Sequence, residues 1–250
     1  MTLSFDLFWS FRSPYSYLVT DRIVAFQKDY DVQCNVRPVY PIAVRQPEFF
    51  ANSDPLWFSY FARDIHRSAQ FLDIPFRWAN PDPVQMDPQT RTYPKEQPYI
   101  YRLTRLGMAA VERGRGLEFI EQVGRLIWGG TVAGWHDGDH LAEATERAGL
   151  DLAVLDKQIE DEADRLDSEI AMNQEAQREG GADDARQPKR QRTRAAHPDI
   201  AQALLQQDRR DTGRRHLGQG LPDVFRKRGG LHFISVRGRD AGAPDRNGRS

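Results

Sequence analysis

The stretch LSFDLFWSFRSPYSYLVTDRIVAF, residues 3–26, decides the fold because its hydrophobic period changes from two to about 3.6 within it. Alternation in the first half predicts a strand, and helical spacing in the second half predicts a helix that begins near Ser13. Pro14 suits the first helical turn because it has no backbone N–H, and Ser13 suits the cap position, where a hydroxyl oxygen accepts from an amide. On these residues alone, the turn is a plain helix cap. The apolar positions are Leu3, Phe5, Leu7 and Trp9 in the strand and Leu18, Val19, Ile23 and Phe26 in the helix.

A second strand is predicted where Val32, Cys34 and Val36 alternate ahead of a proline. It follows the first helix closely, so the three segments form a β-α-β unit. Helical spacing then recurs along the chain, except in a proline-rich connection over residues 75–98. An irregular stretch of this length is usually functional or packed on a neighbouring segment. Further helices are expected over residues 55–72, 103–111, 119–127, 139–148 and 151–159, and an acidic helix ends near residue 179.

The composition is typical of a soluble protein with one or two domains. The 250 residues are 39% hydrophobic and carry a formal net charge of −1, which gives no global reason to expect a nucleic-acid or membrane partner. Cys34 is the only cysteine, so an intramolecular disulfide is excluded, and the alternating pattern predicts a small core residue there. No run approaches the roughly 20 apolar residues that span a bilayer, and no signal segment is expected. The expected location is cytoplasmic.

The run DLFWSFRSPYSYL resembles the start of the thioredoxin-fold family that contains kappa-class glutathione transferases and 2-hydroxychromene-2-carboxylate isomerases. The resemblance extends from about Leu3 to Gly181, and further patterns of the family follow in order. In disulfide-forming relatives a Cys-Pro-x-Cys element occupies the strand-to-helix turn, and here Ser13 and Ser16 stand where its two cysteines would be. The resemblance therefore implies a member without resident disulfide chemistry. The further patterns are RPVYPIA, EQPYIYRLTRLG, RLIWGG, GWHDGDHL and ERAGLDL.

The family's design implies an α/β protein, a thioredoxin-like fold with an inserted all-helical domain. Residues 1–45 would form the N-terminal βαβ part of the thioredoxin-like domain, and residues 46–165 would form the inserted helical domain. Residues 166–181 would begin the return to the thioredoxin-like domain. Residues 182–250 are expected to be a basic, disordered tail, so that the closing strands of the fold are missing or replaced.

The tail departs from the family pattern where its next motif is due. Residues 178–250 hold 17 Lys or Arg against 9 Asp or Glu, whereas the first 177 residues hold 18 against 27. Two explanations compete. The tail is either a basic extension with its own partner, for which PKRQRTR would be a nucleic-acid patch, or the product of a shifted reading frame. A segment rich in arginine and poor in aromatic residues rarely folds, which favours the second explanation. The apolar run LHFISV within it is expected to be a chance match to a closing strand.

The resemblance further implies catalysis with glutathione as cofactor. The reaction would be a glutathione-dependent cis-trans isomerisation of the 2-hydroxychromene-2-carboxylate type, acting on an aromatic or unsaturated small molecule. Ser13 would be the catalytic residue, because its hydroxyl would donate to the glutathione sulfur and hold it as thiolate at the positive end of a helix. A homodimer is one option for the assembly, and neither a membrane nor nucleic acid is an expected partner of the enzyme. The cofactor-binding residues would be Phe11, Arg12, Pro14, Tyr15 and Asn52.

Three alternative functions stay open at this point. Two of the alternatives are related to the isomerase: a kappa-like glutathione transferase and a thioredoxin-fold relative that has lost redox activity. From another class, the chain could be a binding protein whose basic tail contacts nucleic acid. Retention on glutathione-agarose with thiol titration separates the isomerase from the redox-inactive relative, and salt-dependent retention of the isolated tail on heparin would indicate the binding protein.

Two other groups of residues invite a functional interpretation. The imidazoles and carboxylates of residues 136–140 look like a metal cluster, yet a helix start collects the same residue types as caps, so no metal site is predicted. Four tryptophans could wall an aromatic substrate pocket, although burial in the core is the simpler explanation for each. The first group is His136, Asp137, Asp139 and His140, and the second is Trp57, Trp78, Trp128 and Trp135.

Overall fold

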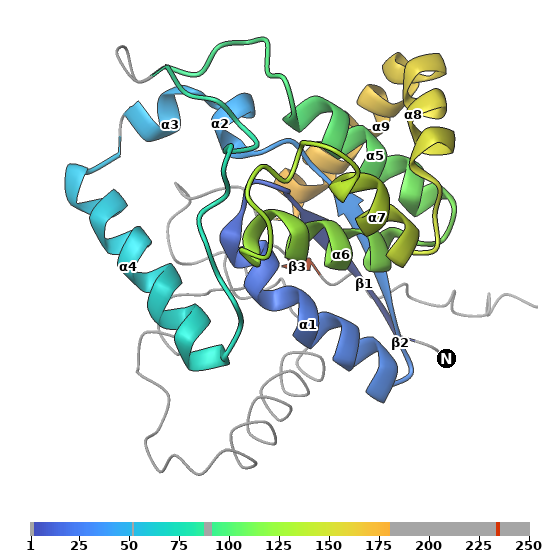
Figure 1. Cartoon of the computed structure of the whole chain (residues 1–250), viewed down its shortest axis with the longest axis horizontal. Helices are drawn as coiled ribbons and strands as arrows, with labels where there is room; N and C mark the ends of the chain where they lie inside the picture. Colours follow the sequence, from blue (N-terminus) through green and yellow to red (C-terminus); the bar gives the residue numbers. More distant parts are fainter. Residues whose placement is uncertain (1–2, 52, 88–91, 181–233, 236–250) are drawn as a thin grey trace, which may run out of the picture.

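Two parallel strands lie at the centre of the fold (Figure 1). β1 (Leu3–Trp9) and β2 (Val32–Pro38) pair along their whole length, and α1 (Pro14–Asp29) connects them. The predicted β-α-β unit is therefore confirmed. The computed structural model describes residues 3–51, 53–87, 92–180 and 234–235.

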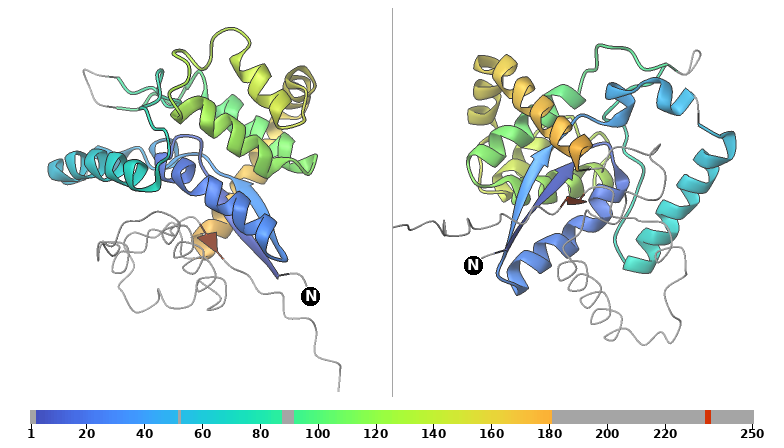
Figure 2. Two further views of the ribbon diagram at one scale, coloured as in Figure 1. Left: turned by 60° about the horizontal axis from the view of Figure 1, so that its bottom comes forward. Right: turned by 180° about the vertical axis from the view of Figure 1, so that it is seen from behind.

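The helices after β2 include one that stands apart from the others. α4, which is 18 residues long, lies at the edge of the molecule away from α8 and α9 in each view (Figures 1 and 2). α5 and α6 pack on each other and against the β-α-β unit. The helices are α2 (Ile42–Arg45), α3 (Glu48–Ala51), α4 (Pro55–Leu72), α5 (Ile100–Glu112), α6 (Gly116–Trp128), α7 (His140–Arg147), α8 (Leu152–Asp161) and α9 (Ala163–Glu179).

The helices expected from the sequence are present, with small differences at their ends. α5 and α6 each begin three residues before the first apolar position of the pattern. Asp151 caps α8 by accepting from the Ala153 amide at 2.8 Å. Asp139 precedes α7 as expected, but its carboxylate makes no capping hydrogen bond. Among the helices of the described ranges, none combines the length and the apolar character needed to cross a membrane.

A short third strand corrects one expectation. β3 (Ile234–Ser235) pairs antiparallel with Leu7 and Asp6 of β1, on the edge opposite β2. Ile234 and Ser235 of the run LHFISV therefore do pair with the sheet, and the expectation that this run is a chance match to a closing strand is wrong at these two residues. The physical reason is that β1 would otherwise present an open edge of N–H and C=O groups, which a short apolar run can satisfy. Residues 182–233 and 236–250 lie outside the described residues, so the shifted reading frame stays a prediction.

Core packing holds the backbone that leads into α1. Phe11 is 1% exposed, and its ring meets Trp9 and Phe119 edge to face, with centroids 6.3 and 6.1 Å away. A Cβ at Gly107 of α5 would lie 3.0 Å from this ring, so glycine permits the close approach of α5. The indole Nε1 of Trp128 donates to the Phe11 carbonyl at 3.1 Å. The loop between β1 and α1 is thus fixed from two helices.

Buried polar contacts join α9 to the end of β2. Asn173 donates to the carbonyl of Pro38 at 3.1 Å and accepts from Arg37 at 3.3 Å. Arg37 also lies 3.0 Å from the buried carboxylate of Asp6 in β1. Because buried polar groups need partners, these contacts fix where α9 meets the sheet.

Candidate functional site

The first turn of α1 carries a hydroxyl group at the N-terminal end of the helix. Ser13 is the cap residue, with an extended backbone, and its Oγ accepts from the Ser16 amide at 3.3 Å. Since the oxygen serves as an acceptor, the hydroxyl proton of Ser13 is available to donate to a ligand. The end of the helix adds partial positive charge at the same place. The turn can therefore stabilise a negatively charged atom.

The two serines of the turn differ in access. Ser13 is half-buried, whereas Ser16 is 1% exposed and its Oγ has no hydrogen-bond partner in the described structure. Only Ser13 can meet a ligand without rearrangement of the core. Ser16 occupies the inner position of the turn.

The thiol of the chain lies away from this turn. Cys34 pairs with Phe5 in the sheet, four residues along β1 from Trp9, which is about 13 Å. Burial and then the charge of Asp6 raise the pKa of the Cys34 thiol, so it stays protonated. Cys34 lies in a strand, as predicted, and cannot act as a nucleophile at Ser13.

Arg12 is held by a carboxylate and two rings. Its guanidinium donates to both oxygens of Asp82, at 2.9 and 3.0 Å, and lies over the rings of Phe50 and Tyr93 at 5.5 and 5.1 Å. Burial alone would lower the pKa of Arg12, but the hydrogen bonds and charge of Asp82 outweigh burial and raise it. Arg12 is therefore always charged, and its charge is balanced locally. It anchors the connection after α4 beside the turn.

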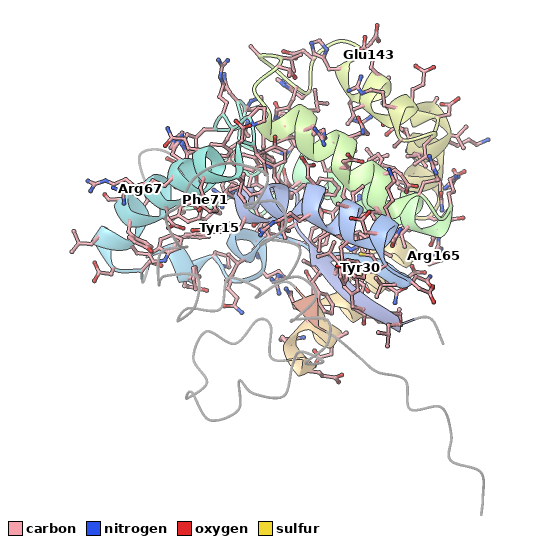
Figure 3. The ribbon with its side chains drawn as sticks, turned by 90° about the horizontal axis from the view of Figure 1, so that it is seen from below. Tyr15, Tyr30, Arg67, Phe71, Glu143 and Arg165 are labelled. Atoms are coloured by element: carbon pink, nitrogen blue, oxygen red, sulfur yellow. The ribbon has the colours of Figure 1, made fainter. Side chains whose placement is uncertain are left out.

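Tyr15 links α1 to α4. Its hydroxyl donates to Asp64 at 2.6 Å, and its ring meets Phe61 edge to face at 5.6 Å. Burial and then the hydrogen bond to Asp64 raise the pKa of Tyr15, so the hydroxyl remains a donor at neutral pH. Figure 3 labels Tyr15 close to α4. The side chain fixes one wall of the site.

A row of aromatic side chains continues from this wall. It passes through three of the four tryptophans singled out in the sequence, whereas Trp135 packs elsewhere, against Tyr99 at 5.4 Å. Trp78 is 37% exposed, so part of the row is open to solvent. Successive ring centroids are Phe50 to Trp57 at 5.9 Å, Trp57 to Phe61 at 5.1 Å, Phe61 to Trp78 at 5.9 Å and Trp78 to Trp128 at 6.3 Å.

The other predicted cofactor-binding residues have different positions. The Phe11 ring packs in the core between Trp9 and Phe119, and the expectation that Phe11 binds the cofactor stays a prediction. Pro14 is buried as the first residue of α1 and shapes the turn through its backbone. Asn52 lies outside the described residues.

The residues singled out as a superficial metal cluster do not gather around one point. His136 lies 3.2 Å from Asp137, and its ring contacts Tyr99 at 4.9 Å. Across the part of the chain that the structure describes, no three His, Cys, Asp or Glu side chains are placed to hold an ion. His66 is exposed and accepts from the Trp78 indole at 3.1 Å.

Several residues of the site gave no sequence signal of their own. Asp64 and Asp82 meet Tyr15 and Arg12 across 49 and 70 residues, and no local pattern encodes such pairs. The proline-rich connection was a partial signal, since its length indicated packing or function and it does supply Asp82. For Phe11 the sequence did contain a signal. Phe11 continues the alternation of apolar residues of β1 beyond Trp9, and residues in this alternation are expected to face the core.

The fold and the turn together define a class of protein. Residues 5–182 match the family model of the DSBA-like thioredoxin domain. The chain therefore belongs to this family. The match covers nearly the same residues, Leu3 to Gly181, over which the order of motifs indicates a thioredoxin-fold relative.

Comparison with solved structures gives distant likenesses. A probable DsbA oxidoreductase from Streptomyces coelicolor has a TM-score of 0.50 at 15% identity, and the match covers 94% of this chain and 100% of that one. A 2-hydroxychromene-2-carboxylate isomerase has a TM-score of 0.49 at 18% identity, with 68% of this chain and 78% of that one covered. A comparison with curated proteins finds no match. The likeness to the oxidoreductase is one of fold.

Proposed function

We propose that this chain is a glutathione-dependent cis-trans isomerase of the 2-hydroxychromene-2-carboxylate type. The observation that carries the proposal is the hydroxyl of Ser13 at the cap of α1, in a DsbA-like fold whose turn holds no thiol. Sulfur chemistry at this turn then needs a ligand to supply the sulfur. The motif DLFWSFRSPYSYL, which resembles the isomerase and kappa-transferase family, supports glutathione as that ligand.

The residues at the turn fit the sulfur end of glutathione. Glutathione, when bound, supplies a thiolate for reversible addition to a conjugated double bond. Ser13 would donate its hydroxyl proton to the sulfur, and the positive end of α1 would favour the anion. Arg12 adds less charge than the sequence alone implies, because Asp82 balances it, and its role is to hold the wall beside the turn.

The aromatic row offers a surface for an aromatic substrate. Flat rings that are partly exposed beside a polar turn favour a planar apolar ligand, which can stack or pack edge to face. Trp78 supplies exposed ring area, and Tyr15, fixed by Asp64, supplies a rigid edge. The substrate's double bond would then lie between this row and Ser13.

The test is isomerisation of 2-hydroxychromene-2-carboxylate, followed by absorbance with and without glutathione. We expect turnover only when glutathione is present. Cys34→Ser is the matched control, and it should keep turnover because this thiol lies in β2. Glutathione-independent turnover that Cys34→Ser abolishes would move the nucleophile to the strand and overturn the proposal. A stable glutathione conjugate in place of the isomer would indicate the transferase instead.

A binding measurement tests the same site without turnover. The thiol of glutathione is titrated by its ultraviolet absorbance in the presence of excess protein, and we expect the bound thiol to ionise at lower pH than the free one. Ser13→Ala should remove much of this difference, whereas Ser16→Ala should not, because Ser16 is buried. An unshifted titration with the unaltered protein would contradict the role of Ser13.

A further inference from the structure

The aromatic row is attached to the first turn of α1 at two points. The Arg12 guanidinium lies over the Phe50 ring at 5.5 Å, and the Tyr15 ring meets Phe61 at 5.6 Å. Between these two contacts the rings of the row follow one another without a break. Ser13 lies between Arg12 and Tyr15 in the chain. A substrate that packs on this part of the row is therefore held close to Ser13.

Tyr93 lies at the Arg12 end of this part of the row. The Arg12 guanidinium lies over its ring at 5.1 Å, and the ring meets that of Phe50 at 5.8 Å. The side chain is half-buried. It comes from the connection between α4 and α5, which also supplies Asp82. The position of the phenol relative to the first turn of α1 is therefore set by packing on both neighbours.

The hydroxyl oxygen of Tyr93 has a positive charge on one side. Nη2 of Arg12 donates to this oxygen at 3.4 Å, so the O–H bond of Tyr93 points away from the guanidinium. Asp82 accepts from Arg12 and from the Val84 amide. Among the residues that the structure describes, none accepts the Tyr93 proton. This proton is therefore available to a ligand.

Three other donors beside the row already have acceptors in the protein. The Tyr15 hydroxyl and the indoles of Trp78 and Trp128 all donate to protein groups. The Ser13 hydroxyl is the proposed donor to the sulfur. Tyr93 is thus a further hydroxyl of the site, with a proton that can meet a second charged atom.

The proposed isomerisation places negative charge on such a second atom. A double bond conjugated to a carbonyl group takes up the sulfur at one carbon while its electron pair moves to the carbonyl oxygen. After rotation, the reverse movement breaks the carbon–sulfur bond and restores the double bond. A fixed donor at the carbonyl oxygen lowers the barrier, because it stabilises the charge where the charge develops.

We propose that Tyr93 is a catalytic residue that donates a hydrogen bond to the carbonyl oxygen of the substrate. This inference rests on the proposed isomerisation and adds a second charge-stabilising group to Ser13. The phenol keeps its proton throughout, so both directions of electron movement leave the protein unchanged. Arg12 acts through Tyr93, because a guanidinium that donates to the phenol oxygen makes the phenol a stronger donor.

The first experiment measures the binding of an oxyanion without glutathione. The probes are 4-nitrophenolate, at a pH above the pKa of 4-nitrophenol, and uncharged 4-nitroanisole, both followed by equilibrium dialysis. Loss of a hydrogen bond to a charged group should raise the Kd of 4-nitrophenolate roughly ten- to hundred-fold in Tyr93→Phe. The Kd of 4-nitroanisole should not change, because the ring of residue 93 is kept.

Tyr101→Phe is the matched control for both experiments. The Tyr101 hydroxyl donates to the Lys95 carbonyl of the same connection, and its ring packs on Tyr40 instead of the row. Tyr101→Phe should therefore bind 4-nitrophenolate as the unaltered protein does. An equal Kd of 4-nitrophenolate in Tyr93→Phe and Tyr101→Phe would overturn the proposal.

The second experiment measures turnover at saturating glutathione. We expect kcat to fall roughly ten- to hundred-fold in Tyr93→Phe, and the ultraviolet titration of the bound glutathione thiol to stay as in the unaltered protein. A thiol titration that changes in Tyr93→Phe would show that the substitution disturbs the turn at Ser13, and the catalytic assignment of Tyr93 would then be wrong.

The remaining outcomes separate this inference from the proposed function. If Tyr93→Phe isomerises the substrate as fast as the unaltered protein, the assignment of Tyr93 is wrong and the isomerase proposal stands. If the unaltered protein shows no turnover, the isomerase proposal and the catalytic role of Tyr93 are both wrong. The binding of 4-nitrophenolate would still show whether Tyr93 holds an oxyanion.

Discussion

The hydroxyl of Tyr15 donates a 2.6 Å hydrogen bond to Asp64, so the first turn of α1 and the middle of α4 share one contact. Asp64 precedes Ile65, a fully buried residue of α4, and follows Arg63 on the outer face. This turn of α4 therefore supports the wall of the candidate site. A change in Asp64 should therefore alter the position of Tyr15 in the first turn of α1.

Tyr15→Phe should change how the free energy of unfolding depends on pH in the alkaline range. The pKa of Tyr15 is raised above its ordinary 10.0 by burial and by Asp64, so above about pH 10 the unfolded chain loses a proton that the folded chain keeps. The stabilisation that Tyr15 contributes is fully present below about pH 10 and decreases as the pH rises above that value. Urea unfolding from pH 8 to about 11 should show a steeper loss for the unaltered protein than for Tyr15→Phe. Parallel curves would contradict the contact with Asp64.

Ser13→Ala should lower turnover much more than stability. A hydrogen bond to a charged group contributes about 1.5 to 3 kcal/mol, which corresponds to a loss of roughly ten- to hundred-fold in rate. The lost helix cap costs about 1 kcal/mol of unfolding free energy. Ser16→Ala is the control, because its buried Oγ has no partner in the described structure and its removal should cost little. Wild-type turnover in Ser13→Ala would exclude the assigned role.

Arg12→Lys should destabilise the protein although it keeps the charge. A lysine cannot donate to both oxygens of Asp82 or stack on Phe50 and Tyr93 as the planar guanidinium does. The Arg12 side chain is only 17% exposed, so water replaces these contacts poorly, and a loss of about 1 to 2 kcal/mol is expected. Denaturant unfolding measures this loss of unfolding free energy. Arg178→Lys on the exposed end of α9 provides the comparison, and equal losses in both variants would show that Asp82 contributes nothing specific.

The sequence predicts the local part of this architecture well because each signal there is short-range. The change of period near Ser13 lies within one run of residues, and the strand, the cap and the helix follow from it. Cys34 is likewise placed in its strand by its immediate neighbours. Such features need no knowledge of the tertiary structure.

What the sequence did not predict depends on residues distant along the chain. The partners of Arg12 and Tyr15 come from the connection after α4 and from α4 itself, and many carboxylates could have filled these roles equally well. β3 pairs with β1 across more than 220 residues, so its short apolar run could not be distinguished from chance. Such contacts join residues that are far apart in the sequence, so only the folded chain shows which residues pair.

Two helix glycines provide a final test of how the core holds the loop between β1 and α1. Gly107→Ala and Gly124→Ala both remove a glycine from a helix interior, which by itself stabilises by about 0.5 to 1 kcal/mol. At Gly124 the new Cβ would lie 3.5 Å from Trp9, an ordinary contact, so Gly124→Ala should raise the melting temperature. At Gly107 it would lie 3.0 Å from the buried ring of Phe11, and overpacking of this kind costs about 1 to 3 kcal/mol. Gly107→Ala should therefore melt lower than Gly124→Ala. It should also lose turnover, because a displaced Phe11 moves the backbone before Ser13. A Gly107→Ala variant as stable and active as Gly124→Ala would show that the loop does not depend on this contact.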